Sequence, residues 1–329
     1  ALPPWRPEPS PALILDELLA HRLVFLSGKG GVGKSTVGAA LALSASRRGK
    51  RVLLVEIEAP VDTARLLGQA GASDRETEVR PNLFTVNLAR RAVMDEYVRL
   101  TVRIDLLARK ILESPVYHRF FAAAPGLPEL MVLGKILALE EAKDGWSRKP
   151  RYDLIVVDAP ATGHGLAFLK VAFAASAAIP VGPVGHNARR VIALLRDPHR
   201  TALGIVAIPE EMAVVEAIEF HRMITQEVGL KPSAVFLNAC HEPRFTGAQE
   251  AEVLRLGKSA TDSRLARGVR LSEALIAARR HIRRRKLTRF YEARLRKAIA
   301  APTVRLPFLF DEELDGASLE KLADRLEAS

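Results

Sequence analysis

The sequence predicts an α/β fold: a doubly wound, mainly parallel sheet of about seven strands with helical insertions. Two observations carry this prediction. Short β-branched and apolar runs alternate with segments of helical periodicity, which is the pattern of βαβ units. Several runs, such as YDLIVVD (152–158), are apolar almost throughout. Strands of a parallel sheet have this composition because both of their faces are buried.

The predicted strands share this apolar character and are bounded by turn residues. In chain order they cover 22–28, 51–60, 82–89, 152–160, 202–210, 233–240 and 303–309. The predicted helices begin after Lys34, Arg91, Pro128, Gly163, Pro209 and Arg264. Ligands of doubly wound folds bind beyond the carboxyl ends of the strands. Functional residues are therefore expected at that edge.

The chain is expected to form one domain after a short N-terminal extension. Residues 1–20 are predicted to be a Pro-rich tail leading into a short helix, and no Gly/Ser linker divides residues 21–329. Two segments, about 91–146 and 163–196, are longer than a plain crossover needs. They follow strand ends where ligands bind. They either form a mobile helical subdomain or simply pack on the sheet.

The sequence also predicts a soluble, cytoplasmic protein. The N-terminal segment has no basic region followed by an apolar core, as a secretory signal would. The longest uncharged apolar stretch, 171–185, contains two prolines and is too short to span a bilayer.

The segment GKGGVGKS (28–35) matches the pattern G-x-x-x-x-G-K-[ST] directly after a predicted strand and before a predicted helix. Backbone N–H groups of such a loop, together with the helix N-terminus, bind phosphates. Lys34 is expected to reach the β- and γ-phosphates and Ser35 to ligate magnesium, so ATP and Mg²⁺ are the expected cofactors. The nucleotide-binding residues predicted here are Gly28, Lys29, Gly30, Gly31, Val32, Gly33, Lys34, Ser35 and Thr36.

Lys29, at the second position of this loop, is a second lysine that phosphate binding does not require. One interpretation is that it crosses to a nucleotide held by a second, facing copy. There it would stabilise charge at the γ-phosphate, as an arginine finger supplied in trans does. The other is a solvated lysine on an exposed loop. The spacing of the residues leaves both open.

Several segments carry a resemblance to a known family. KGGVGKST (29–36) resembles the deviant Walker A motif of the SIMIBI ATPases, a class of P-loop NTPases. DAPATGH (158–164) resembles the D-T-A-P-T-G-H signature of ArsA-like ATPases, which include arsenite-pump and tail-anchored-protein-targeting ATPases. APGLPELMVLGKI (124–136) resembles their P-G-x-x-E segment, and weaker matches follow in order at 208–217, at Asn238 and at 305–314.

The resemblance implies a homodimer formed on ATP binding, with two ATP molecules at its interface and Lys29 contacting the partner's nucleotide. It also places Glu58 on the family's water-positioning aspartate, because EIEAP stands where the family has D-P-A. Glu58 is expected to orient water, at a reduced rate, since it reaches one methylene further. Glu56 is the second candidate, because EIE resembles the D-x-D of ParA/MinD relatives.

Asp158 ends a predicted strand, where a carboxylate can hold magnesium through its waters. The predicted metal residues are therefore Ser35 and Asp158, and the predicted catalytic residues are Lys29, Lys34, Glu58 and Asp158. His164 is either a switch residue or a hydrogen-bonded bystander. For the adenine end, Asn238 is expected to bond the base edge, and Pro307 and Phe308 to supply apolar walls. Packing at the end of the sheet is the alternative for all three.

Two departures from the family limit the function. An arsenite site needs several cysteines, and this chain has only Cys240. A C-x-x-C pair that could join a dimer through zinc is also missing. We therefore expect neither an arsenite nor a zinc site. The first insertion contains only Met94 and Met131 as flexible groove residues, and its apolar positions fit a core face as well as a client groove.

The formal net charge is +11, and residues 279–297 contain ten Lys/Arg against Glu292 alone. This segment is expected to bind DNA, an anionic membrane surface or an acidic partner, with a solvated charged face as the alternative. The main hypothesis is a dimeric, magnesium-dependent ATPase that handles a protein client at its helical insertions. The rival is a ParA/MinD-like positioning ATPase that binds DNA or membrane through the basic segment.

Overall fold

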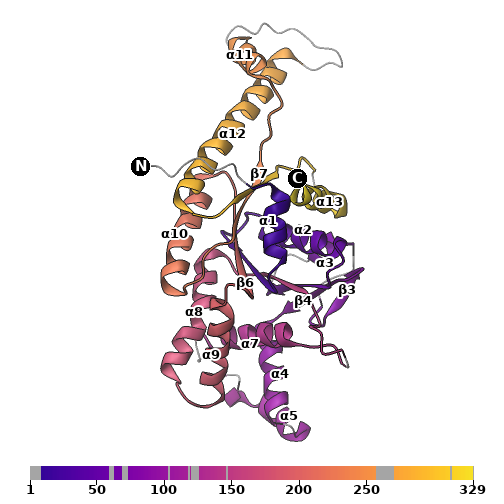
Figure 1. The fold of residues 1–329 in the computed structure, drawn as a ribbon, viewed down its shortest axis with the longest axis vertical. Coiled ribbons are helices and arrows are strands. Elements are labelled where there is room, and N and C mark those ends of the chain that lie inside the picture. Colours follow the sequence, from indigo (N-terminus) through magenta and orange to yellow (C-terminus); the bar gives the residue numbers. More distant parts are fainter. Residues whose placement is uncertain are drawn as a thin grey trace.

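The computed structural model describes residues 9–58, 63–68, 73–102, 104–117, 119, 126–145, 147–256, 270–311 and 313–328. Its centre is an eight-stranded sheet in the order β3-β4-β2-β5-β1-β6-β7-β8, with helices on both faces (Figure 1). The strands are β1 (Leu23–Gly28), β2 (Val52–Ile57), β3 (Thr77–Arg80), β4 (Leu83–Leu88), β5 (Leu154–Asp158), β6 (Thr201–Ala207), β7 (Ala234–Cys240) and β8 (Thr303–Pro307).

The predicted α/β class is confirmed, but the sheet has eight strands rather than about seven. The additional strand is β3, which pairs antiparallel with β4 at the edge of the sheet, whereas every other pair of neighbours is parallel. Its sequence, TEVR, buries only Val79. An edge strand that is half exposed lacks the apolar run by which the other seven were predicted.

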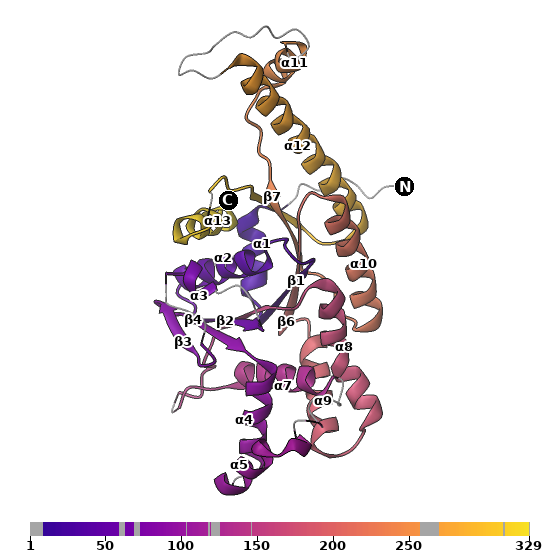
Figure 2. The same cartoon turned by 180° about the vertical axis from the view of Figure 1, so that it is seen from behind.

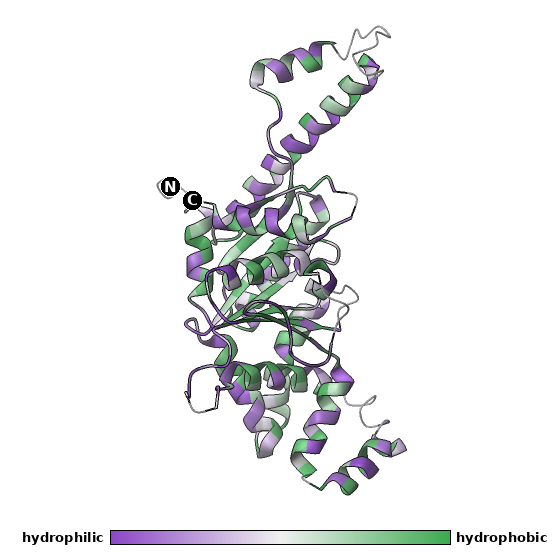
Figure 3. Ribbon diagram, turned by 90° about the vertical axis from the view of Figure 1, so that its right-hand side faces the viewer, coloured by the Kyte–Doolittle hydropathy of each residue, from purple (hydrophilic) through white to green (hydrophobic). Residues whose placement is uncertain are grey.

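Alternate residues of the central strands feed two hydrophobic cores. Leu23 and Phe25 of β1 face one core, and Val24 and Leu26 face the other. The first core is completed by α4 (Arg90–Val102), α7 (Leu127–Glu141), α8 (Thr162–Ala178), α9 (Gly182–Arg196), α10 (Glu211–Glu227) and α12 (Leu271–Ala298). The second is completed by α1 (Pro11–Leu19), α2 (Lys34–Arg47) and α13 (Gly316–Glu327). In Figure 3 the strands are green and lie between helices with purple outer faces.

Helices of the two predicted insertions pack together beside the sheet. α7 packs against α4 of its own insertion and against α8 and α9 of the other. α5 (Asp105–Glu113) follows α4 at the far end of the molecule (Figures 1 and 2). Together α4, α5, α7, α8 and α9 are called the helical region below. Whether it moves as a unit stays a prediction, and Pro125 of the P-G-x-x-E segment lies outside the described residues.

At the opposite end, α11 (Gly247–Leu256) and the first part of α12 extend beyond the sheet (Figures 1 and 2). We call this part, residues 247–256 and 271–290, the arm. The last part of α12 is anchored in the first core by Leu295, which is fully buried. Within the described ranges, no helix combines the length and apolar character that a bilayer crossing requires.

Candidate nucleotide-binding site

The sheet brings the predicted site residues together at the carboxyl ends of β1, β2 and β5. Asp158, the last residue of β5, is in register with Leu26 of β1 on one side and with Glu56 of β2 on the other. The phosphate loop follows β1 directly, and α2 begins at Lys34. Three motifs that are far apart in the chain therefore meet at one edge, as a doubly wound sheet requires.

The loop conformation depends on its glycines. Gly31 and Gly33 have φ angles of 81° and 85°, in a region that side chains with a Cβ rarely adopt. A Cβ on Gly28 would lie 2.1 Å from the carbonyl oxygen of Val206. The carbonyl of Val32 accepts a hydrogen bond of 2.9 Å from Asn238 Nδ2. These constraints hold the backbone in a tight turn at the N-terminus of α2, where N–H groups can face phosphate.

Lys34, Ser35 and Asp158 form the inner part of the site. Ser35 Oγ donates a hydrogen bond of 2.5 Å to Asp158 Oδ2, and Lys34 Nζ lies 3.4 Å from the carbonyl oxygen of Lys29. Burial lowers the pKa of Lys34, and the charge of Asp158 opposes that shift. Burial also raises the pKa of Asp158, against the hydrogen bond from Ser35 and the charge of Lys34. Each charged group thus partly compensates the desolvation of the other.

This arrangement fits magnesium. Asp158 is 7% exposed, and its Oδ1 atom is buried without a hydrogen-bond partner among the described residues. A buried carboxylate oxygen without a partner is costly, and a hard cation or its water would satisfy it. The Ser35 hydroxyl lies beside it, so the chain offers the two oxygen donors that the sequence predicted.

Glu58 is placed just beyond β2 with a φ of 46° and is ion-paired to Arg90 of α4. Arg90 Nε lies 2.6 Å from Glu58 Oε2, and Arg90 Nη1 lies 2.6 Å from Glu129 Oε1 of α7. The hydrogen bond from Arg90 lowers the pKa of Glu58, with burial opposing. Arg90 thus connects the predicted water-positioning carboxylate to the glutamate of the P-G-x-x-E segment.

Glu56, the second candidate for orienting water, is 1% exposed and lies within β2 beside Asp158. Its Oε1 accepts a hydrogen bond of 3.3 Å from the backbone N–H of Thr63. Glu58 is more accessible, with 37% of its side chain exposed. Accessibility favours Glu58 for contact with a water molecule at the γ-phosphate.

Lys29 is held by Glu216 of α10, a residue to which the sequence analysis gave no role. Lys29 Nζ lies 2.7 Å from Glu216 Oε1, and Thr162 Oγ1 lies 3.2 Å from Glu216 Oε2. Thr162 belongs to the DAPATGH motif and starts α8. One carboxylate therefore contacts both the phosphate loop and the DAPATGH motif. Glu216 falls in the weakly matching segment 208–217, which was its only signal in the sequence.

Asn238, Pro307 and Phe308 lie at the carboxyl ends of the neighbouring strands β7 and β8. Asn238 contacts the phosphate loop through Val32, and a Cβ on Gly33 would lie 2.4 Å from its Nδ2 atom. Phe308 stacks on His241, with ring centroids 4.9 Å apart. His241, which the sequence analysis missed, thus extends the predicted apolar wall by one aromatic ring.

His164 is exposed in the first turn of α8. Cys240 is buried, and burial raises the pKa of its thiol to about 12. It is therefore neutral at physiological pH, whereas a soft metal or metalloid ligand must be a thiolate. Among the described residues, no group of three His, Cys, Asp or Glu side chains could hold a metal ion.

Comparison with known proteins agrees with this geometry. Residues 21–180 match the family model of the anion-transporting ATPases. The chain is 30% identical to the ATPase BagA of Mycobacterium tuberculosis over 331 residues, which cover 94% of both proteins. The chain belongs to the ArsA-like ATPase family.

More distant ArsA-like relatives match over shorter regions. An arsenical pump-driving ATPase of Escherichia coli is 26% identical over 238 residues, which cover 71% of this chain and 38% of that protein. One of Acidiphilium multivorum is 26% identical over 232 residues, which cover 65% of this chain and 39% of that protein. The chain thus spans less than half of these arsenical pump-driving relatives, but nearly all of BagA.

Proposed function

We propose that this ArsA-like ATPase hydrolyses ATP in a magnesium-dependent dimer and uses the closure of that dimer to handle a protein client. The observation that supports it most is the inner site, where Lys34, Ser35 and the unpartnered oxygen of Asp158 converge on the phosphate loop. We expect the cycle to run in the cytoplasm, where ATP is abundant. Arsenite transport is not part of the proposal, because the one cysteine is buried and neutral.

In the proposed reaction, the loop N–H groups and Lys34 bind the β- and γ-phosphates. Ser35 and Asp158 would hold magnesium, which would supply charge neutralisation at the transferred phosphoryl group. Glu58 would accept a hydrogen bond from the attacking water. It must first leave Arg90, because its Oε2 accepts hydrogen bonds from that guanidinium and its Oε1 accepts one from the backbone N–H of Arg90 in the present state. Movement of α4 relative to β2 would provide that release.

Lys29 would complete the site of the facing copy. In the present state it is paired with Glu216, so dimer closure has to exchange this partner for the nucleotide of the other subunit. The same exchange would leave Glu216 with Thr162 alone. ATP binding and the DAPATGH segment would then be coupled through one carboxylate.

The helical region offers a surface for an apolar client segment. Leu100, Leu106 and Val116 are 69%, 68% and 73% exposed. The exposed apolar residues of this region, counting the segments that flank its helices, are Leu100, Ile104, Leu106, Leu107, Val116, Ile179 and Val181. Monomeric soluble proteins rarely expose so many large apolar side chains in one region unless they bind a partner there.

The experiment that tests the proposed function is a joint measurement of oligomeric state and phosphate release. Purified protein is studied by light scattering and a phosphate assay with ATP, with ATP and magnesium, and with neither. We expect a tighter dimer and steady hydrolysis only with ATP and magnesium. Hydrolysis by a strict monomer, or no hydrolysis under any condition, would contradict the proposal.

The rival, a positioning ATPase, is favoured by one observation, the exposed cations of α12. The two candidates differ in what the ATP-bound dimer captures. A client handler would be crosslinked to apolar segments through the helical region. A positioning ATPase would bind DNA or membrane only in its ATP state.

A further inference from the structure

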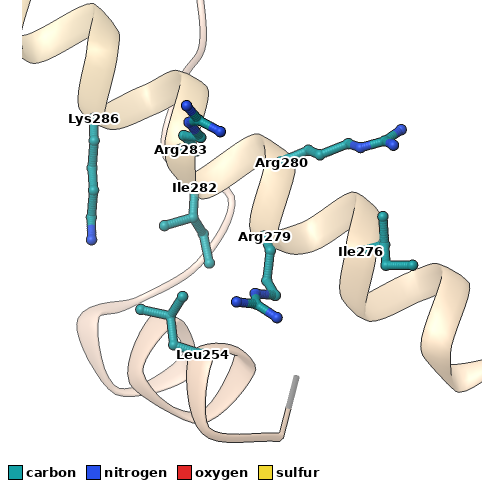
Figure 4. Close-up of a pocket in the computed structure, with 7 residues that line it drawn as sticks. All are labelled: Leu254, Ile276, Arg279, Arg280, Ile282, Arg283 and Lys286. Atoms are coloured by element: carbon teal, nitrogen blue, oxygen red, sulfur yellow. The ribbon is translucent and has the colours of Figure 1, made fainter. Parts of the chain in front are cut away.

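The arm contains a cavity between α11 and α12 with a volume of about 430 Å³ (Figure 4). Its apolar lining is Leu254, Ile276 and Ile282, and its remaining lining is cationic. The cationic residues are Arg279, Arg280, Arg283 and Lys286 of α12. None of the described residues that line the cavity is acidic. The lining therefore combines apolar and positively charged side chains.

The cavity continues into an exposed face along α12. Ile276, Leu287 and Phe290 are 51%, 40% and 61% exposed, and their spacing places them on one side of the helix. Arg280 and Arg283 lie on the same side. Glu292 lies on the opposite side, where it is 3% exposed and ion-paired with Arg305. We call this side of α12, together with the cavity, the arm face.

A ligand that offers only phosphates would bind the cations of the arm face and leave its apolar side chains exposed to water. The phosphates of a nucleic acid would attract Arg280, Arg283 and Lys286 but leave Ile276 and Phe290 in water. The boundary of an anionic bilayer satisfies both classes of side chain. Head-group phosphates attract the cations, and the apolar side chains enter the layer between head groups and acyl chains.

The position of the arm favours a flat ligand. Its free end extends beyond the sheet and beyond the helices around it in both views (Figures 1 and 2). Arginine and lysine side chains can lay their apolar stems in the same boundary and keep their charged ends at the phosphates. The arm face therefore offers both basic and apolar side chains, and binding to an anionic membrane surface draws on both.

We propose that the arm face docks on a bilayer of anionic phospholipid. The charges of Arg280, Arg283 and Lys286 meet head-group phosphates, and Ile276 and Phe290 enter the interface. This inference does not depend on the proposed ATPase cycle, because no residue of the arm face contacts the nucleotide site in the structure.

The test is flotation of the full chain with vesicles of phosphatidylcholine mixed with phosphatidylglycerol, and with vesicles of phosphatidylcholine alone. The wild type is expected to float with the anionic vesicles only, and less so as salt is raised. The double variant Arg280→Glu and Arg283→Glu should bind anionic vesicles roughly 30-fold more weakly or worse.

A matched control separates this surface from net charge. The double variant Arg222→Glu and Arg289→Glu makes the same change in charge at two exposed positions, on α10 and on another side of α12. It should bind vesicles within about twofold of the wild type if local contact dominates. Nucleotide binding serves as the folding control for every variant. Equal flotation of the Arg280/Arg283 variant and the wild type would overturn the proposal.

A second variant distinguishes a membrane from other anionic partners. Ile276→Ser with Phe290→Ser keeps all charges of the arm face and should still weaken vesicle binding about tenfold, because each removes apolar burial. A wild type that binds duplex DNA or an acidic protein but fails to float with anionic vesicles would also overturn the proposal. So would flotation that the two serine substitutions leave unchanged.

Discussion

The inner and outer parts of the nucleotide site are built differently. Ser35 is hydrogen-bonded to Asp158, and the charges of Lys34 and Asp158 attract each other, in a largely buried cluster that one chain assembles by itself. Lys29 and Glu58 are instead partly exposed and engaged by residues of other helices, Glu216 of α10 and Arg90 of α4. In the proposed cycle, the inner part binds phosphates without rearrangement, whereas the outer part changes partners before it acts. Binding and hydrolysis are therefore expected to respond to different substitutions.

The strongest test of this division is Lys34→Ala. It removes the one side-chain cation of the inner cluster, so binding itself should fail. We expect loss of detectable ATP binding by calorimetry and a fall in hydrolysis of about 10³-fold. Ordinary ATP affinity in this variant would mean that the inner cluster is not the phosphate site.

Lys29→Ala should separate binding from turnover. ATP binding should stay within about threefold of the wild type, whereas kcat should fall roughly 10³-fold if this lysine acts as a cation supplied in trans. The measurements are nucleotide affinity, kcat and the dimer fraction with ATP and magnesium. Full activity at concentrations where the variant is monomeric would leave Lys29 an ordinary surface charge.

Glu58→Gln should bind ATP and accumulate as a dimer, with hydrolysis slowed by roughly 10²-fold because the glutamine orients water less well. Glu56→Gln serves as the comparison, and the larger loss identifies the residue that orients water. Mixing Glu58→Gln with Lys29→Ala sharpens the test. A mixed dimer has one site with an intact Glu58 and a lysine from the other subunit, so partial recovery of phosphate release is expected.

Glu216→Gln should have the smallest effect and the opposite sign. It weakens a half-exposed ion pair that holds Lys29 away from a partner, and such pairs contribute about 0.2–1 kcal/mol. Dimerisation with ATP should therefore become about two- to fivefold easier, as measured by the protein concentration at half-maximal dimer. Glu219→Gln, an exposed neighbour on α10, should leave it unchanged. An unchanged or weaker dimer in Glu216→Gln would show that the pair does not restrain closure.

The sequence was most informative for features that depend on residues adjacent in the chain. The phosphate loop, the strand ending at Asp158 and seven of the eight strands could be predicted, because each depends on a continuous run of residues. The residues that pair with Lys29 and Glu58 in the outer part of the site could not be predicted. Glu216 is 187 residues from Lys29, and Arg90 is 32 residues from Glu58. Only the strand order brings such residues into contact, and no periodicity encodes that order.

Residue composition could not show which cations of the basic segment are paired within the chain. In the structure, Arg285 is paired with Glu250 of α11, and Arg296 is paired with the buried Glu292, which also pairs with Arg305 of β8. The pair of Arg285 with Glu250 joins α12 to α11, and the pair of Glu292 with Arg305 joins it to β8. Only part of the excess charge of 279–297 therefore remains for an external ligand.

The position of α10 connects the pair between Lys29 and Glu216 to parts of the molecule outside the candidate nucleotide site. α10 packs against α8 on one side and against α12 on the other. α12 has 28 residues, so it is about 42 Å long. A tilt of roughly 5° at its anchored end would displace its free end by about 4 Å. Release of Lys29 from Glu216 could thus displace the free end of the arm, because α10 would transmit the movement to α12.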